Sequence, residues 1–253
     1  MSFTTIQAHV DGEVGRLTLD RPEKLNPLGT TTLLELIEAA AWFDEQAVKA
    51  VVVDGRGRAF TAGADLASFE PGGGSADLSP WEAADAGARM ADAIAGMRAV
   101  TVAAIHGYCI GGGVVLAAAC DLRVAADDTV FSIPEVDLGI PLAWGGIPRL
   151  VRELGPARTR ELVMTCRRFT AQEAEAWGFL NQVVPAEEVA QAAQDLATAL
   201  TTKSTLTLTA TKDGVAAALA GRTEPGTDGL VDALADPESR RAGAAYLASV
   251  RAP

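Results

Sequence analysis

The spacing of hydrophobic and polar positions changes several times along the first part of the chain. Residues 6–10 and 17–19 alternate apolar with polar side chains on either side of Asp11-Gly12, which predicts a β-hairpin. Apolar residues then recur every three or four positions over residues 33–46, which predicts a helix. An unbroken apolar run at 50–53 predicts a buried strand.

Strand-like and helical segments continue to alternate through the first two-thirds of the chain. Further strands are expected at 100–105, 122–124, 130–132 and 182–184, a loop at 71–80, and helices at about 81–97, behind the glycines at 111–113, and over most of the chain after Gly145. This alternation is typical of an α/β fold with largely buried strands. The last part of the chain, rich in Ala and Thr, predicts helices that pack on the outside or on a neighbouring subunit.

Composition and charge narrow the class of protein. The 253 residues are 49% hydrophobic and 21% charged, so a disordered chain is excluded and one full-sized core is expected. A formal net charge of −12 disfavours nucleic acid or an anionic membrane as a partner. The sequence shows no signal-peptide pattern and no apolar run of the ~20 residues needed to span a bilayer. Three cysteines without CxxC spacing favour free thiols and a cytoplasmic location.

Glycine-rich segments follow two of the expected strands. Gly111–Gly113 lie between the strand at 100–105 and a small-residue helix, where backbone N–H groups can approach a ligand and the helix dipole favours negative charge. Their spacing excludes a phosphate P-loop and disfavours a dinucleotide site. Ala59–Leu66 (AFTAGADL) follows the strand at 50–53. Tight helix–strand packing or an ordinary turn explains either segment without a ligand.

Glu135 lies in a mainly apolar stretch, SIPEVDLG, directly after the expected strand at 130–132. A half-buried glutamate tends to have a raised pKa, which suits acid–base catalysis near neutral pH. A solvated or salt-bridged glutamate is the alternative and the more common case.

The order and spacing of these motifs resemble the crotonase superfamily, in particular the enoyl-CoA hydratase/isomerase family. The motifs are RPEKLNPL, AFTAGADL, VAAIHGYCIGGG, FSIPEVDLGI and FTAQEAEAWGFLNQVV, and the likeness runs from about residue 3 to residue 220. The resemblance implies an α/β fold with a spiral core of ββα units over residues 1–196, which holds an acyl-CoA site. It also implies a C-terminal helical trimerisation region over residues 197–253, in a homotrimer or a dimer of trimers. No cofactor is expected, since coenzyme A is part of the substrate.

The resemblance assigns roles to backbone groups. The thioester carbonyl is expected to bind the N–H groups of Ala64 and Gly112, which would form an oxyanion hole. Ala62–Leu66, including Asp65, is similar to the segment that holds the adenine and pantetheine of coenzyme A. Lys24 is a candidate for contact with a coenzyme A phosphate.

The carboxylates depart from the hydratase pattern. Hydratases of this family use two glutamates, but Val115 stands at the first position and only Glu135 remains. A dienoyl-CoA isomerase would need carboxylates at Val115 and Ala143, so that activity is disfavoured. One glutamate resembles the Δ3,Δ2-enoyl-CoA isomerases, which move a single proton and exclude water. A hydratase that works with Glu135 alone, and a non-catalytic acyl-CoA-binding protein, are the alternatives.

Trp144 is a second departure, because hydratases usually carry a small residue there. Its ring is expected either to wall off the acyl site, beside Val115 and Ala143, or to pack on a helix without touching the ligand. A peptidase on a related fold is disfavoured, because no serine, histidine and aspartate are suitably placed.

Overall fold

The computed structural model describes residues 2–66 and 78–251. Most of the expected loop at 71–80 lies outside the described residues. The N-terminal hairpin is confirmed, with antiparallel pairing from Ile6 opposite Leu19 to Asp11 opposite Val14.

The larger sheet has six strands. In order across the sheet they are β1 (Ile6–Asp11), β2 (Val14–Leu19), β3 (Ala50–Gly55), β4 (Val100–Ile105), β6 (Leu122–Ala126) and β9 (Gln182–Val184). Every neighbouring pair after the hairpin is parallel. Alternate residues of β3 point to two separate buried clusters, Val51 and Val53 to one and Ala50 and Val52 to the other. Because both faces are covered, the central strands read as unbroken apolar runs.

A second, smaller sheet lies beyond the carboxyl ends of the parallel strands. It contains β5 (Tyr108–Ile110), β7 (Val130–Ser132) and β8 (Phe169–Thr170). β5 is parallel to β7, and an isolated bridge joins Thr61 to Cys109 in β5. Thus β3, β4 and β6 are each followed, after a short turn, by a segment that pairs in this second layer.

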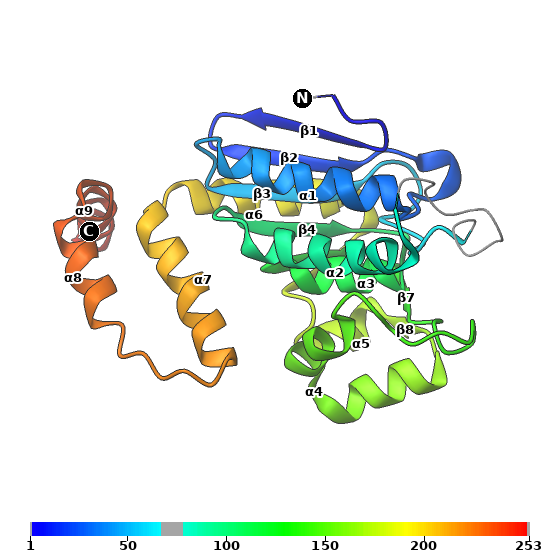
Figure 1. Ribbon diagram of the computed structural model, residues 1–253. Helices are drawn as coiled ribbons and strands as arrows, with labels where there is room; N and C mark the ends of the chain where they lie inside the picture. The colour runs from blue at the N-terminus through cyan, green and yellow to red at the C-terminus, as the bar shows by residue number, and fades with distance from the viewer. Residues whose placement is uncertain (1, 67–77, 252–253) are drawn as a thin grey trace.

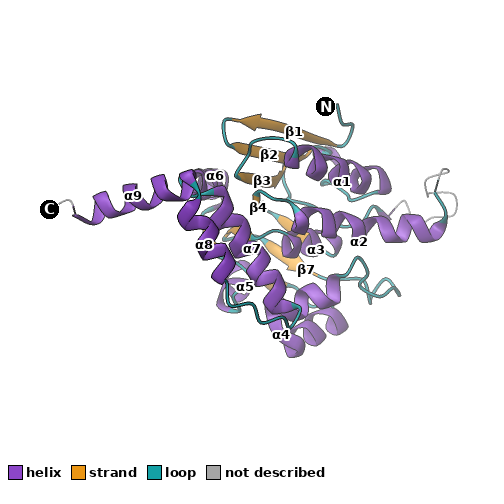
Figure 2. Ribbon diagram, turned by 60° about the vertical axis from the view of Figure 1, so that its left-hand side comes forward, coloured by secondary structure: helices purple, strands orange, loops and turns teal. Residues whose placement is uncertain are grey.

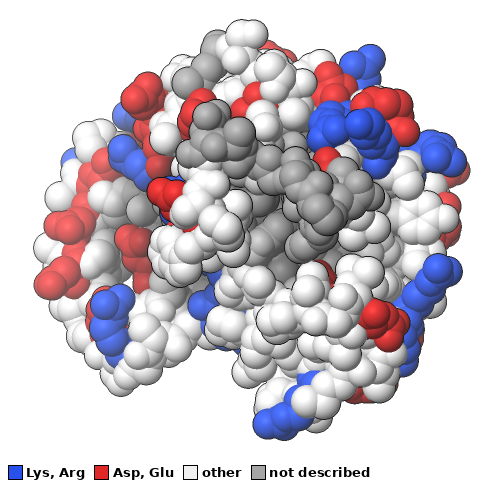
Figure 3. Space-filling model, turned by 45° about the vertical axis from the view of Figure 1, so that its right-hand side comes forward, with Lys and Arg blue, Asp and Glu red and all other residues white. Residues whose placement is uncertain are grey.

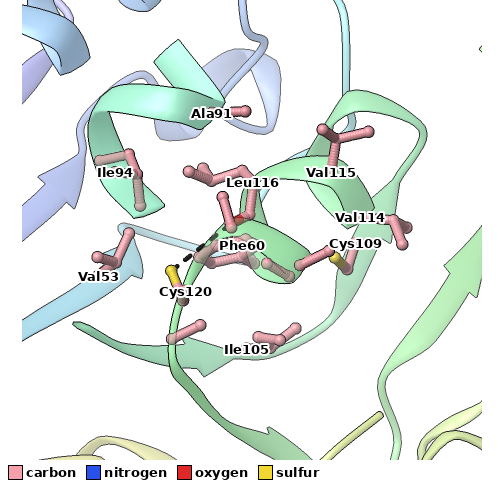
Figure 4. Packing of buried hydrophobic residues seen from close by; sticks show 14 of the residues in the cluster. Val53, Phe60, Ala91, Ile94, Ile105, Cys109, Val114, Val115, Leu116 and Cys120 are labelled. Carbon is pink, nitrogen blue, oxygen red and sulfur yellow. Dashed lines mark hydrogen bonds between the residues drawn. The ribbon is translucent and has the colours of Figure 1, made fainter. Parts of the chain in front are cut away.

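Three helices cover one face of the large sheet (Figure 1). They are α1 (Thr30–Asp44), α2 (Pro80–Gly96) and α3 (Gly112–Ala119). Every residue of α3 is buried. Figure 4 shows α3 between Ala91 and Ile94 of α2 on one side and Ile105 of β4 on another. The small side chains of α3 allow it to lie inside the core.

The remaining helices lie on other faces of the core. They are α4 (Gly146–Thr165), α5 (Ala171–Ala176) and α6 (Val189–Thr201). α4 bends at Gly155, whose φ is +77°, directly before Pro156. α6 packs on β3, β4 and β6, on the face opposite α1 to α3 (Figure 1).

Two lysines attach the C-terminal helices to the core. These helices are α7 (Thr205–Leu219), α8 (Thr227–Ala235) and α9 (Pro237–Arg251). Lys49, before β3, forms an ion pair of 2.6 Å with Glu238. Lys212 of α7 donates to the carbonyl of Ala99 at 2.9 Å and forms an ion pair of 2.7 Å with Asp121. These contacts tie α7 and α9 to the core.

The outer surface of α7 to α9 exposes many apolar side chains, and α9 extends away from the sheets (Figures 1 and 2). The exposed residues are Val215, Leu219, Leu230, Val231, Leu234, Tyr246, Leu247 and Val250. The expected boundary between residues 196 and 197 falls within α6. In the part of the chain that the structure describes, no helix is long and apolar enough to cross a bilayer.

Candidate active site

The segments that follow β3, β5 and β7 meet beside the second sheet. They carry Ala64, Gly112 and Glu135, respectively. The loops are adjacent because β5 pairs with β7 on one side and bridges to Thr61 on the other. The tertiary structure therefore brings together three motifs that are far apart in the sequence.

Gly63 holds the first loop close to the second. Its φ is +88°, and a Cβ built on it would lie 2.5 Å from the carbonyl oxygen of Ile110. The Thr61 hydroxyl accepts a hydrogen bond from the Gly63 N–H at 3.0 Å, and the Gly63 carbonyl accepts one from the N–H of Leu28 at 2.8 Å. Within residues 2–66 and 78–251, the N–H of Ala64 donates no hydrogen bond. This donor is left for a ligand.

Asn26, which was not singled out from the sequence, holds this loop through hydrogen bonds. It is 1% exposed, and its amide donates to the carbonyls of Arg56 and Ala59, each at 2.9 Å. Its own carbonyl accepts a hydrogen bond from Thr61 at 2.6 Å. Its place in RPEKLNPL was the available signal in the sequence. In the structure its φ is +54°, a conformation that asparagine tolerates in turns, where its side chain bonds nearby backbone groups.

The second loop forms the first turn of α3. Gly111 has a φ of +50° and is the residue before the helix. No partner among the described residues accepts a hydrogen bond from the N–H of Gly112, the first helical residue. Such a free N–H at a helix N-terminus carries partial positive charge and favours an anionic ligand.

Glu135 lies directly against Gly111. A Cβ on Gly111 would overlap Oε1 of Glu135, so any larger residue there would force this carboxyl group to move. Oε2 of Glu135 is buried and has no hydrogen-bond partner in the described part of the chain. Burial raises the pKa of Glu135 above its ordinary value, and a hydrogen bond from its own backbone opposes this only in part. The environment thus favours a proton-accepting group over a permanently charged one.

Oε2 of Glu135, which is unpaired among the described residues, lies next to the turn that carries the free N–H of Gly112, and the Ala64 loop adjoins that turn. The carboxylate can remove a proton from carbon, and the donors can stabilise the negative charge that develops on a neighbouring oxygen. Because the donors belong to the backbone, they are held in place before any ligand binds.

Val115 and Ala143 add no second carboxylate to this site. Val115 is fully buried one turn into α3, and its Cγ2 would lie 2.8 Å from a Cβ on Gly146. Ala143 is exposed in the loop before α4. Neither residue supplies a carboxylate that could share a catalytic water with Glu135.

Trp144 both packs on a helix and borders the site. Its indole lies over Gly87 of α2 and also over Gly112, because a Cβ on either glycine would overlap the ring. The expected packing on a helix is seen, and a role of the ring in walling off the acyl site remains a prediction. Gly87 was missed, although a lone glycine inside a helical pattern is a signal of close packing.

The segment expected to bind coenzyme A lies at the surface. Lys24 is exposed in the short helix η1 (Pro22–Lys24), Leu66 is exposed, and Ala62 is half-buried. Asp65 forms an ion pair of 3.3 Å with Arg21. On the face shown in Figure 3, basic side chains are interspersed with acidic ones and form no broad patch. Contact with coenzyme A at Lys24, Ala62, Asp65 and Leu66 remains a prediction.

Comparison with known proteins identifies the family. A profile described as "Enoyl-CoA hydratase/isomerase" matches residues 9–237. The chain is 36% identical over 218 residues to the probable enoyl-CoA hydratase of Mycobacterium bovis, covering 85% of this chain and 82% of that protein. It is 37% identical over 206 residues to the carnitinyl-CoA dehydratase of Escherichia coli, covering 80% and 77%.

Solved structures extend the likeness to the fold. A crystal structure of an enoyl-CoA hydratase/isomerase family protein from Hyphomonas neptunium has a TM-score of 0.89 and 28% identity, with 97% of this chain and 95% of that chain covered. The resemblance inferred from the motifs and the expected α/β crotonase-like fold are both confirmed. The chain belongs to the enoyl-CoA hydratase/isomerase family of the crotonase superfamily.

Proposed function

We propose that this protein is an enoyl-CoA isomerase in which Glu135 is the single acid–base residue. The observation that carries the proposal is the buried Oε2 of Glu135, which has no partner among the described residues, in a carboxyl group that lies against Gly111 directly before α3. Val115 replaces the second glutamate that a two-carboxylate hydration requires. An acyl-CoA thioester as substrate is consistent with the family.

The reaction moves one proton and one double bond. The Glu135 carboxylate removes a proton from C2 of a 3-enoyl-CoA, and the electrons of that bond form an enolate on the thioester. The N–H groups of Ala64 and Gly112 donate to the enolate oxygen. Protonated Glu135 then returns the proton to C4, which leaves a double bond between C2 and C3 and restores the carboxylate. Apolar surroundings exclude the water that would divert the intermediate.

The direct test supplies the purified protein with a 3-enoyl-CoA and follows the absorbance of the conjugated 2-enoyl thioester. Conversion without formation of 3-hydroxyacyl-CoA is the expected result. If the 3-enoyl-CoA is bound but not converted, the isomerase proposal fails.

Hydration with Glu135 alone is the second candidate, because several relatives, such as the crotonyl-CoA hydratase of Syntrophomonas wolfei, are named as hydratases. It predicts that a 2-enoyl-CoA gives 3-hydroxyacyl-CoA at a slow but measurable rate. If no enoyl-CoA is converted in either assay, an acyl-CoA-binding role without catalysis replaces both proposals.

The pH profile should show the environment of Glu135. Burial raises its pKa above 4.5, and the catalytic form is the carboxylate. The kcat/KM for the isomerisation should therefore rise with pH through an apparent pKa above that value and then level off. A profile that stays flat from about pH 4 to pH 8, across the ordinary range of glutamate, would show that a group other than Glu135 limits the rate.

We also propose that the chain assembles as a homotrimer or a dimer of trimers. The exposed apolar side chains of α7 to α9 support this proposal, because monomeric proteins rarely leave such large patches uncovered. Sedimentation equilibrium should give three or six chain masses, and Leu230→Asp should reduce that mass. A monomeric wild-type protein at micromolar concentration would contradict the proposal.

A further inference from the structure

Trp144 occupies a slot that two glycines from different helices create. Three indole atoms would overlap a Cβ on Gly87 of α2, and the far edge of the ring, at Cζ3, would overlap a Cβ on Gly112 of α3. Even an alanine at either position would displace the ring. The indole fits between the two helices because neither glycine has a side chain.

The backbone of Trp144 is also held in an unusual conformation. Its φ is +57°, a value that bulky residues rarely adopt. Arg149 of α4, which is 7% exposed, donates to the carbonyl oxygens of Trp144 at 3.4 Å and of Gly145 at 3.2 Å. The same guanidinium forms an ion pair with Asp92 of α2. Arg149 thus fixes the loop to both helices, and the ring has little freedom to move aside.

The slot lies immediately beside the reacting groups. Gly111 contacts the carboxyl group of Glu135, and the next residue, Gly112, contacts the indole. Consecutive Cα atoms are about 3.8 Å apart. An acyl group whose carbonyl oxygen accepts from the N–H of Gly112, with C2 at Glu135, therefore lies within reach of the indole of Trp144.

We propose that Trp144 is the specificity-determining residue of the acyl site and restricts the enzyme to short acyl groups. This inference rests on the proposed function, because it takes the thioester to lie at Gly112 and Glu135. The indole fills the volume into which a longer chain would continue. Gly87 and Arg149 are positioning residues, since they act only through Trp144.

The restriction should disappear when the ring is removed. In an open apolar site, each added methylene increases affinity by about fourfold, as expected for burial of a CH₂ group. For the wild-type protein, affinity should stop rising, or fall, beyond a short chain. For Trp144→Ala it should continue to rise with chain length, and Trp144→Phe should be intermediate.

The experiment measures dissociation constants for butyryl-, hexanoyl-, octanoyl- and decanoyl-CoA by calorimetry. These saturated thioesters cannot react, so the readout does not depend on turnover. Trp42→Ala is the matched control, because Trp42 is an equally half-buried indole that packs on Phe43 in α1. This control should keep the wild-type dependence on chain length.

The outcomes separate the two proposals. Thermal denaturation first checks that the wild-type protein and both Trp144 variants are folded. If their affinities then depend on chain length in the same way, the specificity proposal is overturned and the proposed function stands. If the wild-type protein binds none of the four thioesters, the proposed function and the inference both fail. Trp144→Phe keeps the test decisive if Trp144→Ala does not fold.

Discussion

Glu135→Gln is expected to reduce the kcat of double-bond isomerisation by about 10²–10⁴-fold, the range in which a positioned acid–base group contributes. Glutamine has nearly the same shape as glutamate and fits against Gly111, but it cannot accept the proton from C2. The affinity for a saturated acyl-CoA should stay close to that of the wild-type protein, because the backbone donors at Ala64 and Gly112 are untouched. Steady-state kinetics with a 3-enoyl-CoA, together with calorimetric binding, provide the measurement.

Asp137→Asn is the matched control for this variant. Asp137 is an exposed carboxylate two residues further along the same loop, so its loss should leave turnover unchanged. Full activity in Glu135→Gln would remove Glu135 from the mechanism. Loss of binding as well as turnover would assign it a structural role in place of a catalytic one.

The same variant should change stability in a pH-dependent way. Burial raises the pKa of Glu135, so the folded state holds this proton more tightly than the unfolded state does. The wild-type protein consequently loses stability relative to Glu135→Gln as the pH rises from the ordinary value of 4.5 through the raised pKa. Thermal denaturation at a series of pH values checks this sign, and a constant difference would contradict it.

Gly63→Ala is expected to lower kcat by about 10²–10³-fold, the typical cost of losing one oxyanion donor. The new Cβ would lie 2.5 Å from the carbonyl oxygen of Ile110, and the φ of +88° is unfavourable for alanine. The loop must move to relieve this contact, and the N–H of Ala64 moves with it. This substitution reaches a backbone donor that no side-chain deletion can remove directly.

Gly178→Ala separates the loss of the donor from backbone strain. Gly178 has a φ of +81°, but a Cβ on it meets no atom within 4 Å. The control should therefore lose stability in thermal denaturation and retain kcat. If the two variants lose activity equally once their unfolded fractions are taken into account, the position of the Ala64 N–H is not important for the rate.

Local sequence patterns predicted most of the elements and their order. Alternation predicted the hairpin. Unbroken apolar runs predicted strands that are buried on both faces, because side chains on both faces of such a strand contact packed layers. The short strands β5 and β8, of three and two residues, were not predicted, since they are too short to show a period. The motifs around Gly63, Gly111–Gly113 and Glu135 were recognisable only together, because their order and spacing resemble the crotonase superfamily.

Contacts between distant residues were decided only by the tertiary structure. No local pattern shows that Gly111 leaves room for the carboxyl group of Glu135, or that Oε2 is buried without a partner among the described residues. Nor does the sequence show that Gly87 and Gly112 lie on opposite sides of the Trp144 indole, with Arg149 holding the loop. The sequence by itself therefore determined the fold family, the order of the elements and the candidate base. The surroundings of that base and the position of the Trp144 ring depend on which helices pack together. Close packing joins residues that are distant in the sequence and meet only when the chain folds.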